Sequence, residues 1–254
     1  MDHFSRVKEE FKRQAEALSV ASVFTDSGVL EQIRSAIKPT RTMSLLDLGC
    51  GPGIVTAVMA PDVREVVAYD LTPEMLDQAR KRCQEAGLKN VRFELGQAEQ
   101  LPFEEESFDC VVTRLTIHHF VDPGRVINGV ARVTRQGGKV VVADVVSSEN
   151  DEEARLHNAL EILRDPTHVR MLPSREMLAM LESAGLRITS QVTWGMKRDY
   201  EEWIRITNAP ERVKPLYTVM ETLAKAGLNA GINLHFDGKT VTFTHQWFLV
   251  TAEK

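Results

Sequence analysis

Apolar residues in the first half of the chain follow two alternating patterns, short continuous runs and stretches with helical spacing. Runs of strand length, which are typical of buried strands, occupy residues 43–48, 65–69, 91–95, 108–113 and 139–143. Between them, apolar residues three or four positions apart predict helices at 54–60, 75–86 and 123–133. Such alternation indicates an α/β fold, doubly wound, with a parallel sheet covered by helices on both faces.

The two ends of the chain add further helices and strands. Helical spacing from Phe4 to Leu18, and again over 29–37, predicts that residues 1–40 are mostly helical. In the second half we expect helices at 152–163 and 174–184 and strands at 186–193 and 241–250. Helical patterning over 200–226 is too long for a simple connection and suggests a lid, and Asp237-Gly238 between apolar alternations predicts a hairpin.

The stretch LLDLGCGPG, residues 45–53, joins the first strand to its helix through a glycine-rich turn. Glycines let backbone N–H groups approach a ligand that a Cβ would keep away, and Pro52 fixes a φ suited to a first helical turn. The turn is therefore expected to bind a small ligand. A dinucleotide fingerprint would need its third glycine at Ile54, and the GKT at 238–240 has Asn233 at the first glycine of a P-loop, so both phosphate-binding motifs are disfavoured.

Asp70 ends the second strand, about twenty residues after the first glycine, where nucleotide-binding folds place an acid on the ribose. The alternative is that Asp70 only caps the next helix, but Thr72-Pro73-Glu74 already provides an N-cap, an N1 proline and a first-turn acid. A ribose acid without phosphate-binding motifs suggests an adenosine cofactor such as S-adenosylmethionine.

Several motifs carry a resemblance to a known family: LLDLGCGPG, AYDLTPEML, GQAEQLPF (96–103), FDCVVTRLTIHHFVDP (108–123) and GGKVVVAD (137–144). Over roughly residues 40–145 the chain resembles the class I S-adenosylmethionine-dependent methyltransferases related to ubiquinone/menaquinone biosynthesis methyltransferases. The resemblance implies a mostly parallel seven-stranded sheet with an antiparallel last strand, the cofactor across its switch point, and a helical cap. It further implies that residues 1–40 form an N-terminal cap over the cofactor, and that the methyltransferase domain, 41–254, has cap insertions near 145–173 and 196–230.

Ligands in such sheets bind outside the carboxyl ends of the strands, where the motif residues gather. We predict that the cofactor contacts are Gly49, Gly51, Gly53, Asp70, Leu71, Met75, Gln97, Ala98 and Arg114. The family commonly has Asp where this chain has Gln97, whose carbonyl can still accept from an adenine amino group, though without the charge.

Histidines 118, 119, 157 and 168 are the candidates for chemistry. His119 and His168 are preferred because both should lie near the rim, His119 as a general base and His168 orienting the acceptor. Alternatively, these histidines are structural, or an acceptor that is already ionised needs no base. No cysteine and no pair of acids lies at a spacing from these histidines that is typical of metal ligands, so no metal is expected. The segment Arg164 to Pro173 could be a simple turn or could supply substrate contacts.

Composition narrows the choice of acceptor. A net charge of -5 and the lack of a Lys/Arg cluster with aromatics argue against nucleic acid. Without an apolar run of about 18 residues or a signal core, the protein is expected to be cytoplasmic with no membrane span. A small, largely apolar acceptor is favoured by methionines and tryptophans in the expected cap, although these could simply pack it: Met171, Met177, Met180, Trp194, Met196, Trp203 and Met220. The alternatives to a methyltransferase are a nicotinamide-dependent oxidoreductase and a non-enzymatic cofactor-sensing or interaction protein.

Overall fold

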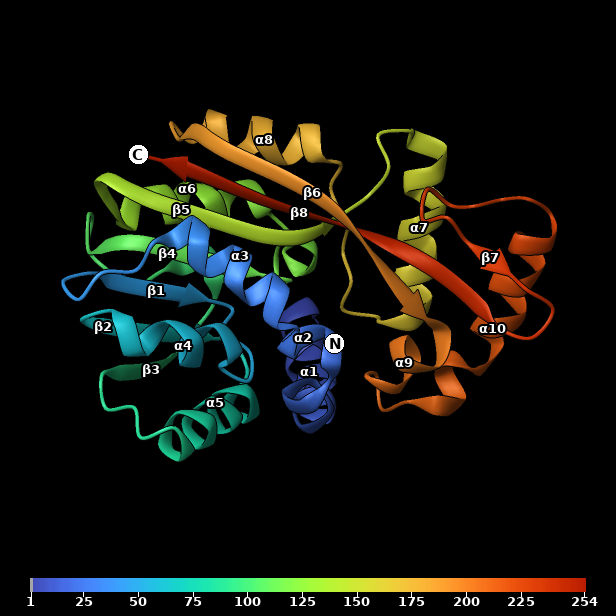
Figure 1. Cartoon of the computed structure of the whole chain (residues 1–254), viewed down its shortest axis with the longest axis horizontal. Coiled ribbons are helices and arrows are strands. Elements are labelled where there is room, and N and C mark those ends of the chain that lie inside the picture. The colour runs from blue at the N-terminus through green and yellow to red at the C-terminus, as the bar shows by residue number, and fades with distance from the viewer. Residues whose placement is uncertain (1) are drawn as a thin grey trace.

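A single sheet runs through the computed structural model, which describes residues 2–254 (Figure 1). Its strand order is β3-β2-β1-β4-β5-β8-β6, with β7 added beside β8. The strands are β1 (Ser44–Leu48), β2 (Glu65–Asp70), β3 (Val91–Leu95), β4 (Phe108–Arg114), β5 (Thr134–Val146), β6 (Arg187–Asp199), β7 (His235–Phe236) and β8 (Val241–Glu253). Strands β1 to β5 are parallel, and β8 is antiparallel to both β5 and β6. The mostly parallel sheet with an antiparallel last strand is confirmed, and the short β7 raises the expected seven strands to eight.

Helices cover both faces of this sheet, as predicted. They are α1 (His3–Val20), α2 (Ser22–Thr25), α3 (Ser27–Ile37), α4 (Ile54–Met59), α5 (Pro73–Glu85), α6 (Pro123–Val133), α7 (Asp151–Arg164), α8 (Ser174–Ser183), α9 (Tyr200–Arg205) and α10 (Pro210–Lys225), with short 3-10 turns at Ala60–Asp62, Ala98–Gln100 and Ile117–His119. Successive residues of β1 point to opposite faces, so Leu45 packs with α3 and α4 whereas Leu46 packs with α6 and α8.

Three strands are longer than their apolar runs predicted. The expected strands at 139–143, 186–193 and 241–250 extend to 134–146, 187–199 and 241–253. Strand β6 contains many polar residues and is largely exposed, yet it pairs with β8 from Arg187 to Asp199. Backbone pairing with a buried neighbour therefore sustains β6 beyond the reach of its own hydrophobic pattern.

The first residues of β8 form a second, smaller hydrophobic cluster with α7, α9 and α10, at the right of Figure 1. Trp203, Leu216, Met220 and Phe243 are buried in it. The helical patterning at 200–226 thus comprises α9 and α10, and the predicted hairpin at Asp237-Gly238 connects β7 to β8.

The N-terminal helices lie between the sheet and this second cluster, beside the carboxyl end of β1 (Figure 1). Arg82 of α5 donates to the carbonyl oxygen of Ser19 at 2.6 Å, and Lys12 pairs with Glu74. Helix α1 is thereby attached to the first strand-helix units. Among residues 2–254, no helix is both long and apolar enough to cross a bilayer.

Candidate functional site

One cavity extends from the glycine turn after β1 to the end of β6. Its volume, including open solvent at the mouth, is about 1560 Å³. Apolar residues of α1 and α2, including Phe4, Phe11 and Phe24, line it, which places the N-terminal segment over the carboxyl ends of the strands.

The three glycines of the turn have different surroundings. All three have positive φ, but only at Gly51 would a Cβ meet open space, with no heavy atom of residues 2–254 within 4 Å. A Cβ on Gly49 would come 2.5 Å from Thr116 Cγ2, and one on Gly53 would come 2.8 Å from Ala79 Cα. Gly51 and Gly49 line the cavity, whereas Gly53 lies outside its wall and lets α5 pack closely.

Asp70 lies in the wall beside Gly51, at the end of β2. Its Oδ2 accepts from Gly51 N at 2.8 Å and its Oδ1 accepts from Thr72 N at 2.9 Å, which leaves each oxygen a lone pair toward the cavity. Burial raises the pKa of Asp70 despite these bonds. Leu71, Met75 and Ala98 line the same end of the cavity.

Gln97 and Arg114 both make hydrogen bonds within the protein. Gln97 is not among the described residues that line the cavity, and its backbone carbonyl accepts from the Tyr69 hydroxyl at 3.2 Å. Arg114 lines the cavity, but its Nη1 and Nη2 donate to the carbonyl oxygens of Phe24 and Val23 at 2.8 and 3.1 Å. Arg114 therefore anchors α2 to β4.

Asp47, in the middle of β1, was missed by the sequence reasoning. It lines the cavity, accepts from Thr56 Oγ1 at 2.5 Å, and has its pKa raised by burial to about 6. An acid inside an otherwise apolar strand was the signal that could have identified it.

His118 forms a dyad with Asp144, a buried acid near the carboxyl end of β5. Because a carboxylate only accepts, His118 Nδ1 donates to Asp144 Oδ1 at 2.7 Å, and Nε2 is left as the acceptor nitrogen. Asp144 Oδ2 accepts from the backbone N–H groups of Thr116 and Ile117. Burial opposes protonation of His118, but the charge and hydrogen bond of Asp144, together with the charges of Glu161 and Asp165, outweigh it and raise the pKa of His118.

The predicted pair, His119 and His168, lies around His118 in the same cavity wall. Their ring centroids are 4.3 and 5.5 Å from that of His118. His119 Nδ1 lies 3.2 Å from the Thr167 carbonyl oxygen, and His168 Nε2 lies 2.8 Å from Asn158 Oδ1. Burial lowers the pKa of His119 to about 4 and that of His168 to about 3. Both are neutral at pH 7.

The segment Arg164 to Pro173 is both a turn and part of the wall. Asp165 accepts from Thr167 N at 2.9 Å, which forms the turn, and from Gln14 of α1. The N–H groups of Val169 and Arg170 then donate to the His118 carbonyl oxygen. These bonds hold His168 beside His118.

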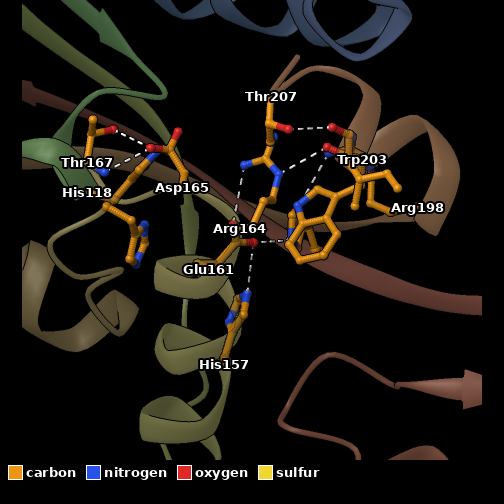
Figure 2. A network of polar contacts seen from close by, with 12 residues as sticks. His118, His157, Glu161, Arg164, Asp165, Thr167, Arg198, Trp203 and Thr207 are labelled. Carbon is orange, nitrogen blue, oxygen red and sulfur yellow. Dashed lines mark hydrogen bonds and ion pairs between the residues drawn. The ribbon is translucent and has the colours of Figure 1, made fainter. Parts of the chain in front are cut away.

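A polar network at the far end of the cavity surrounds Glu161 (Figure 2). His157, Glu161 and His245 offer ligand atoms within 4.8 Å of one another, a grouping that local spacing does not predict because His245 is 84 residues from Glu161. Glu161 lies one helical turn after His157, and β8 brings His245 to them. However, Glu161 Oε1 accepts from His245 Nε2 at 3.0 Å, and Arg164 Nη1 lies 3.5 Å from Glu161 Oε2. The neighbouring guanidinium charge opposes a divalent cation at this cluster.

The methionines and tryptophans expected in the cap divide into two groups. Met171 and Trp203 line the cavity. Met177 and Met220 are buried in the hydrophobic clusters under α8 and α10, and Trp194 stacks on Trp247 with ring centroids 5.7 Å apart. Most of these methionines and tryptophans therefore pack in the hydrophobic clusters rather than line the cavity.

Comparison with known proteins places the chain among methyltransferases. A family profile described as a methyltransferase domain matches residues 21–204. The uncharacterized methyltransferase YcgJ of Bacillus subtilis is 30% identical over 246 residues, 96% of this chain and 97% of that protein. Its crystal structure has a TM-score of 0.83 over 89% of this chain and 98% of that chain.

Two further structures share the fold. A Bacillus halodurans protein has a TM-score of 0.84 and 28% identity, with 90% of this chain and 99% of that chain covered. A geranyl diphosphate C-methyltransferase from Streptomyces coelicolor, in complex with Mg²⁺, geranyl diphosphate and S-adenosyl-L-homocysteine, has a TM-score of 0.62. It is 15% identical, with 90% of this chain and 78% of that chain covered, so this likeness concerns the fold alone.

Proposed function

Because the chain belongs to the class I S-adenosylmethionine-dependent methyltransferases, we propose that its cavity binds S-adenosylmethionine at the glycine turn and a small, largely apolar methyl acceptor beside the histidines. The observation that carries this proposal is the continuity of one cavity from Gly51 and Asp70 to His118 and His168. Neither a nicotinamide oxidoreductase nor a non-enzymatic cofactor-sensing protein is supported by the comparisons.

The residues at the glycine turn fit the cofactor. The side of Gly51 that a Cβ would fill is open, and Asp70 has spare lone pairs for two ribose hydroxyls. Leu71, Met75 and Ala98 would enclose the adenine, and Asp47 supplies an acid for the cationic amino end. Gly49, Gly53, Gln97 and Arg114 would support the cofactor indirectly, by fixing the backbone and α2.

When bound, S-adenosylmethionine supplies an activated methyl group together with its own leaving group. The chain must then align the acceptor, and orientation alone can contribute about 7 to 11 kcal/mol. For an acceptor that loses a proton, we assign the general base to His118 rather than His119. Asp144 orients the His118 ring and raises its pKa, whereas burial lowers the pKa of His119 to about 4 and that of His168 to about 3. His119 and His168 would shape the acceptor site as neutral rings.

The proposed acceptor is a small molecule because α1 and α2 lie over the cavity. Phe4, Phe11, Met171 and Trp203 supply apolar wall on the acceptor side, where a nucleic acid chain would not fit without displacing α1. A net charge of -5 also disfavours a polyanionic acceptor.

Titration calorimetry with S-adenosylhomocysteine tests cofactor binding. Replacing Asp70 with alanine should weaken the affinity by about 1.5 to 3 kcal/mol, the value of a hydrogen bond to a charged group. Asp70→Asn, which keeps one acceptor oxygen, should lose less.

The control is Asp77→Ala, because Asp77 lies exposed on α5 and pairs only with Arg80 among the described residues. Its affinity for S-adenosylhomocysteine should equal that of the unmodified protein. Absence of binding at millimolar S-adenosylhomocysteine by the unmodified protein would overturn the proposed function.

A further inference from the structure

Arg198 is a buried arginine near the end of β6 that lines the acceptor side of the cavity. Its side chain is 7% exposed, and Trp203, Ile206 and Met171 line the same cavity. The Nη1 atom lies 3.5 Å from His245 Nδ1, so one edge of the guanidinium faces the network around Glu161 (Figure 2). The other edge, formed by Nε and Nη2, has Glu202 Oε2 at 4.0 Å from Nε but makes no hydrogen bond within residues 2–254.

The Nε and Nη2 atoms of Arg198 are buried and have no hydrogen-bond partner within residues 2–254. These two N–H groups lie on the same edge of the planar guanidinium and point in parallel, which is the fork that grips the two oxygens of a carboxylate. A buried donor without a partner is destabilising, and more so when the group is charged. The Nε and Nη2 donors of Arg198 therefore need a hydrogen-bond acceptor that a ligand would supply.

The nearby carboxylates of the protein are held by other groups. Glu202 Oε2 lies 4.0 Å from Arg198 Nε, beyond hydrogen-bond distance, and Glu202 also accepts from Ser22 Oγ. Glu161 accepts from His245 and faces Arg164. Asp165 accepts from Thr167 and Gln14. One positive charge thus faces the cavity without a hydrogen-bonded counterion among the described residues.

We propose that Arg198 binds a carboxylate of the methyl acceptor through its Nε and Nη2 atoms. The inference rests on the proposed function and specifies its substrate class: an apolar body, held by Trp203 and Met171, with a carboxylate at the end toward α9. A singly charged carboxylate suits one free guanidinium, whereas a phosphate dianion would bring a second charge near Glu161.

The proposal is tested by thermal-shift and calorimetric titrations with benzoate, phenylacetate and octanoate. Each carboxylate is compared with its primary amide, both with and without saturating S-adenosylhomocysteine. We expect at least one carboxylate to bind roughly 10- to 100-fold more tightly than its amide, the contribution of a charged hydrogen bond. Arg198→Gln should abolish this preference, and Arg198→Lys should retain part of it, because lysine keeps the charge but loses the fork. Arg187→Gln, at the exposed end of the same strand, should leave it unchanged.

Glu202→Gln separates a ligand site from an internal ion pair. If Arg198 serves the ligand, removing Glu202 should strengthen carboxylate binding. If Arg198 and Glu202 only pair with each other, Glu202→Gln should destabilise the fold and leave carboxylate binding unaffected.

Two results would overturn the proposal: no carboxylate preferred over its amide, or a preference that survives Arg198→Gln. Tighter binding of phenyl phosphate than of benzoate would overturn the assignment to a carboxylate. Affinity for S-adenosylhomocysteine, measured on every variant, reports whether the fold and cofactor site are intact. If the unmodified protein does not bind S-adenosylhomocysteine, the methyltransferase proposal is rejected. That result is separate from the carboxylate proposal, because the carboxylate titrations are also made without S-adenosylhomocysteine.

Discussion

Asp70 lies at the carboxyl end of β2 and Asp144 near the carboxyl end of β5, but their neighbours give them opposite pKa shifts. Asp70 accepts two backbone N–H groups, and burial still raises its pKa. Asp144 is buried too, but His118 beside it and backbone donors lower its pKa. Asp144 is therefore a permanent anion that orients His118, whereas Asp70 keeps capacity for a neutral polar ligand.

The protonation of His118 can be measured without knowing the acceptor. Its pKa is raised, so its NMR titration midpoint should lie above 6.5, while His119 and His168 should titrate near 4 and 3. In Asp144→Asn, burial then dominates, and the His118 midpoint should fall below 6.5. If His118 is the base, the acid limb of kcat/KM should follow its midpoint, with activity lost as pH falls through it.

The matched control for this titration is Asp77→Asn, which removes an exposed carboxylate of α5. It should leave all three histidine midpoints in place. A His118 midpoint below 6.5 in the unmodified protein, or an activity limb near pH 4, would contradict the assignment of His118 as the base.

At the scale of elements, the glycine turn matters as much for packing as for binding. Gly53 is the N-cap of α4, at φ 73°, and a Cβ there would meet Ala79 of α5. Gly51 of the same turn and Asp70 at the end of β2 both line the cavity.

Gly53→Ala should therefore destabilise the protein by about 2 to 4 kcal/mol, from left-handed backbone strain plus overpacking against Ala79. The control is Gly87→Ala at the end of α5, where φ is 68° and nothing lies within 4 Å of the new Cβ. It should cost only the backbone strain, about 1 to 2 kcal/mol. Urea denaturation of both variants measures the loss in the free energy of unfolding. Equal losses in the two variants would contradict the prediction, because the new Cβ at position 53 would then meet Ala79 at no cost.

At the scale of the whole molecule, the cavity between the sheet and the second hydrophobic cluster is lined by histidines that burial keeps neutral. The pKa values of His119, His168 and His245 are lowered to about 4, 3 and 4, below the roughly 6.5 of an unfolded histidine. The pKa of Asp47, about 6, is raised above its unfolded value of 3.8.

Stability should consequently rise with pH around pH 5. Unfolding at pH 5 takes up protons at the three histidines and releases one from Asp47, a net uptake of about two. The free energy of unfolding should then increase by about 2 to 3 kcal/mol per pH unit. Urea titrations from pH 4.5 to 6 measure this slope. Asp47→Asn, which removes the released proton, should steepen it, and a flat profile would contradict the burial of these histidines as neutral groups.

The sequence by itself determined the features that depend on local pattern. The alternation of strands and helices, the glycine turn, Asp70 at the end of β2 and the hairpin at Asp237-Gly238 are each specified within a few residues. Backbone conformation and burial of a regular element follow from such short-range patterns, so these predictions agree with the structure.

Only the tertiary structure decided which side chains meet across the cavity. His118 and Asp144 are 26 residues apart, and His245 and Glu161 are 84 apart. The length of β6, which places Arg198 in the cavity, comes from pairing with β8 rather than from its own hydrophobic pattern. Contacts between distant segments depend on strand order, register and helix packing, which no local pattern contains. The glycine-turn end of the cavity was therefore predicted largely from local motifs, whereas the pairing of His118 with Asp144 and the position of Arg198 required the folded chain.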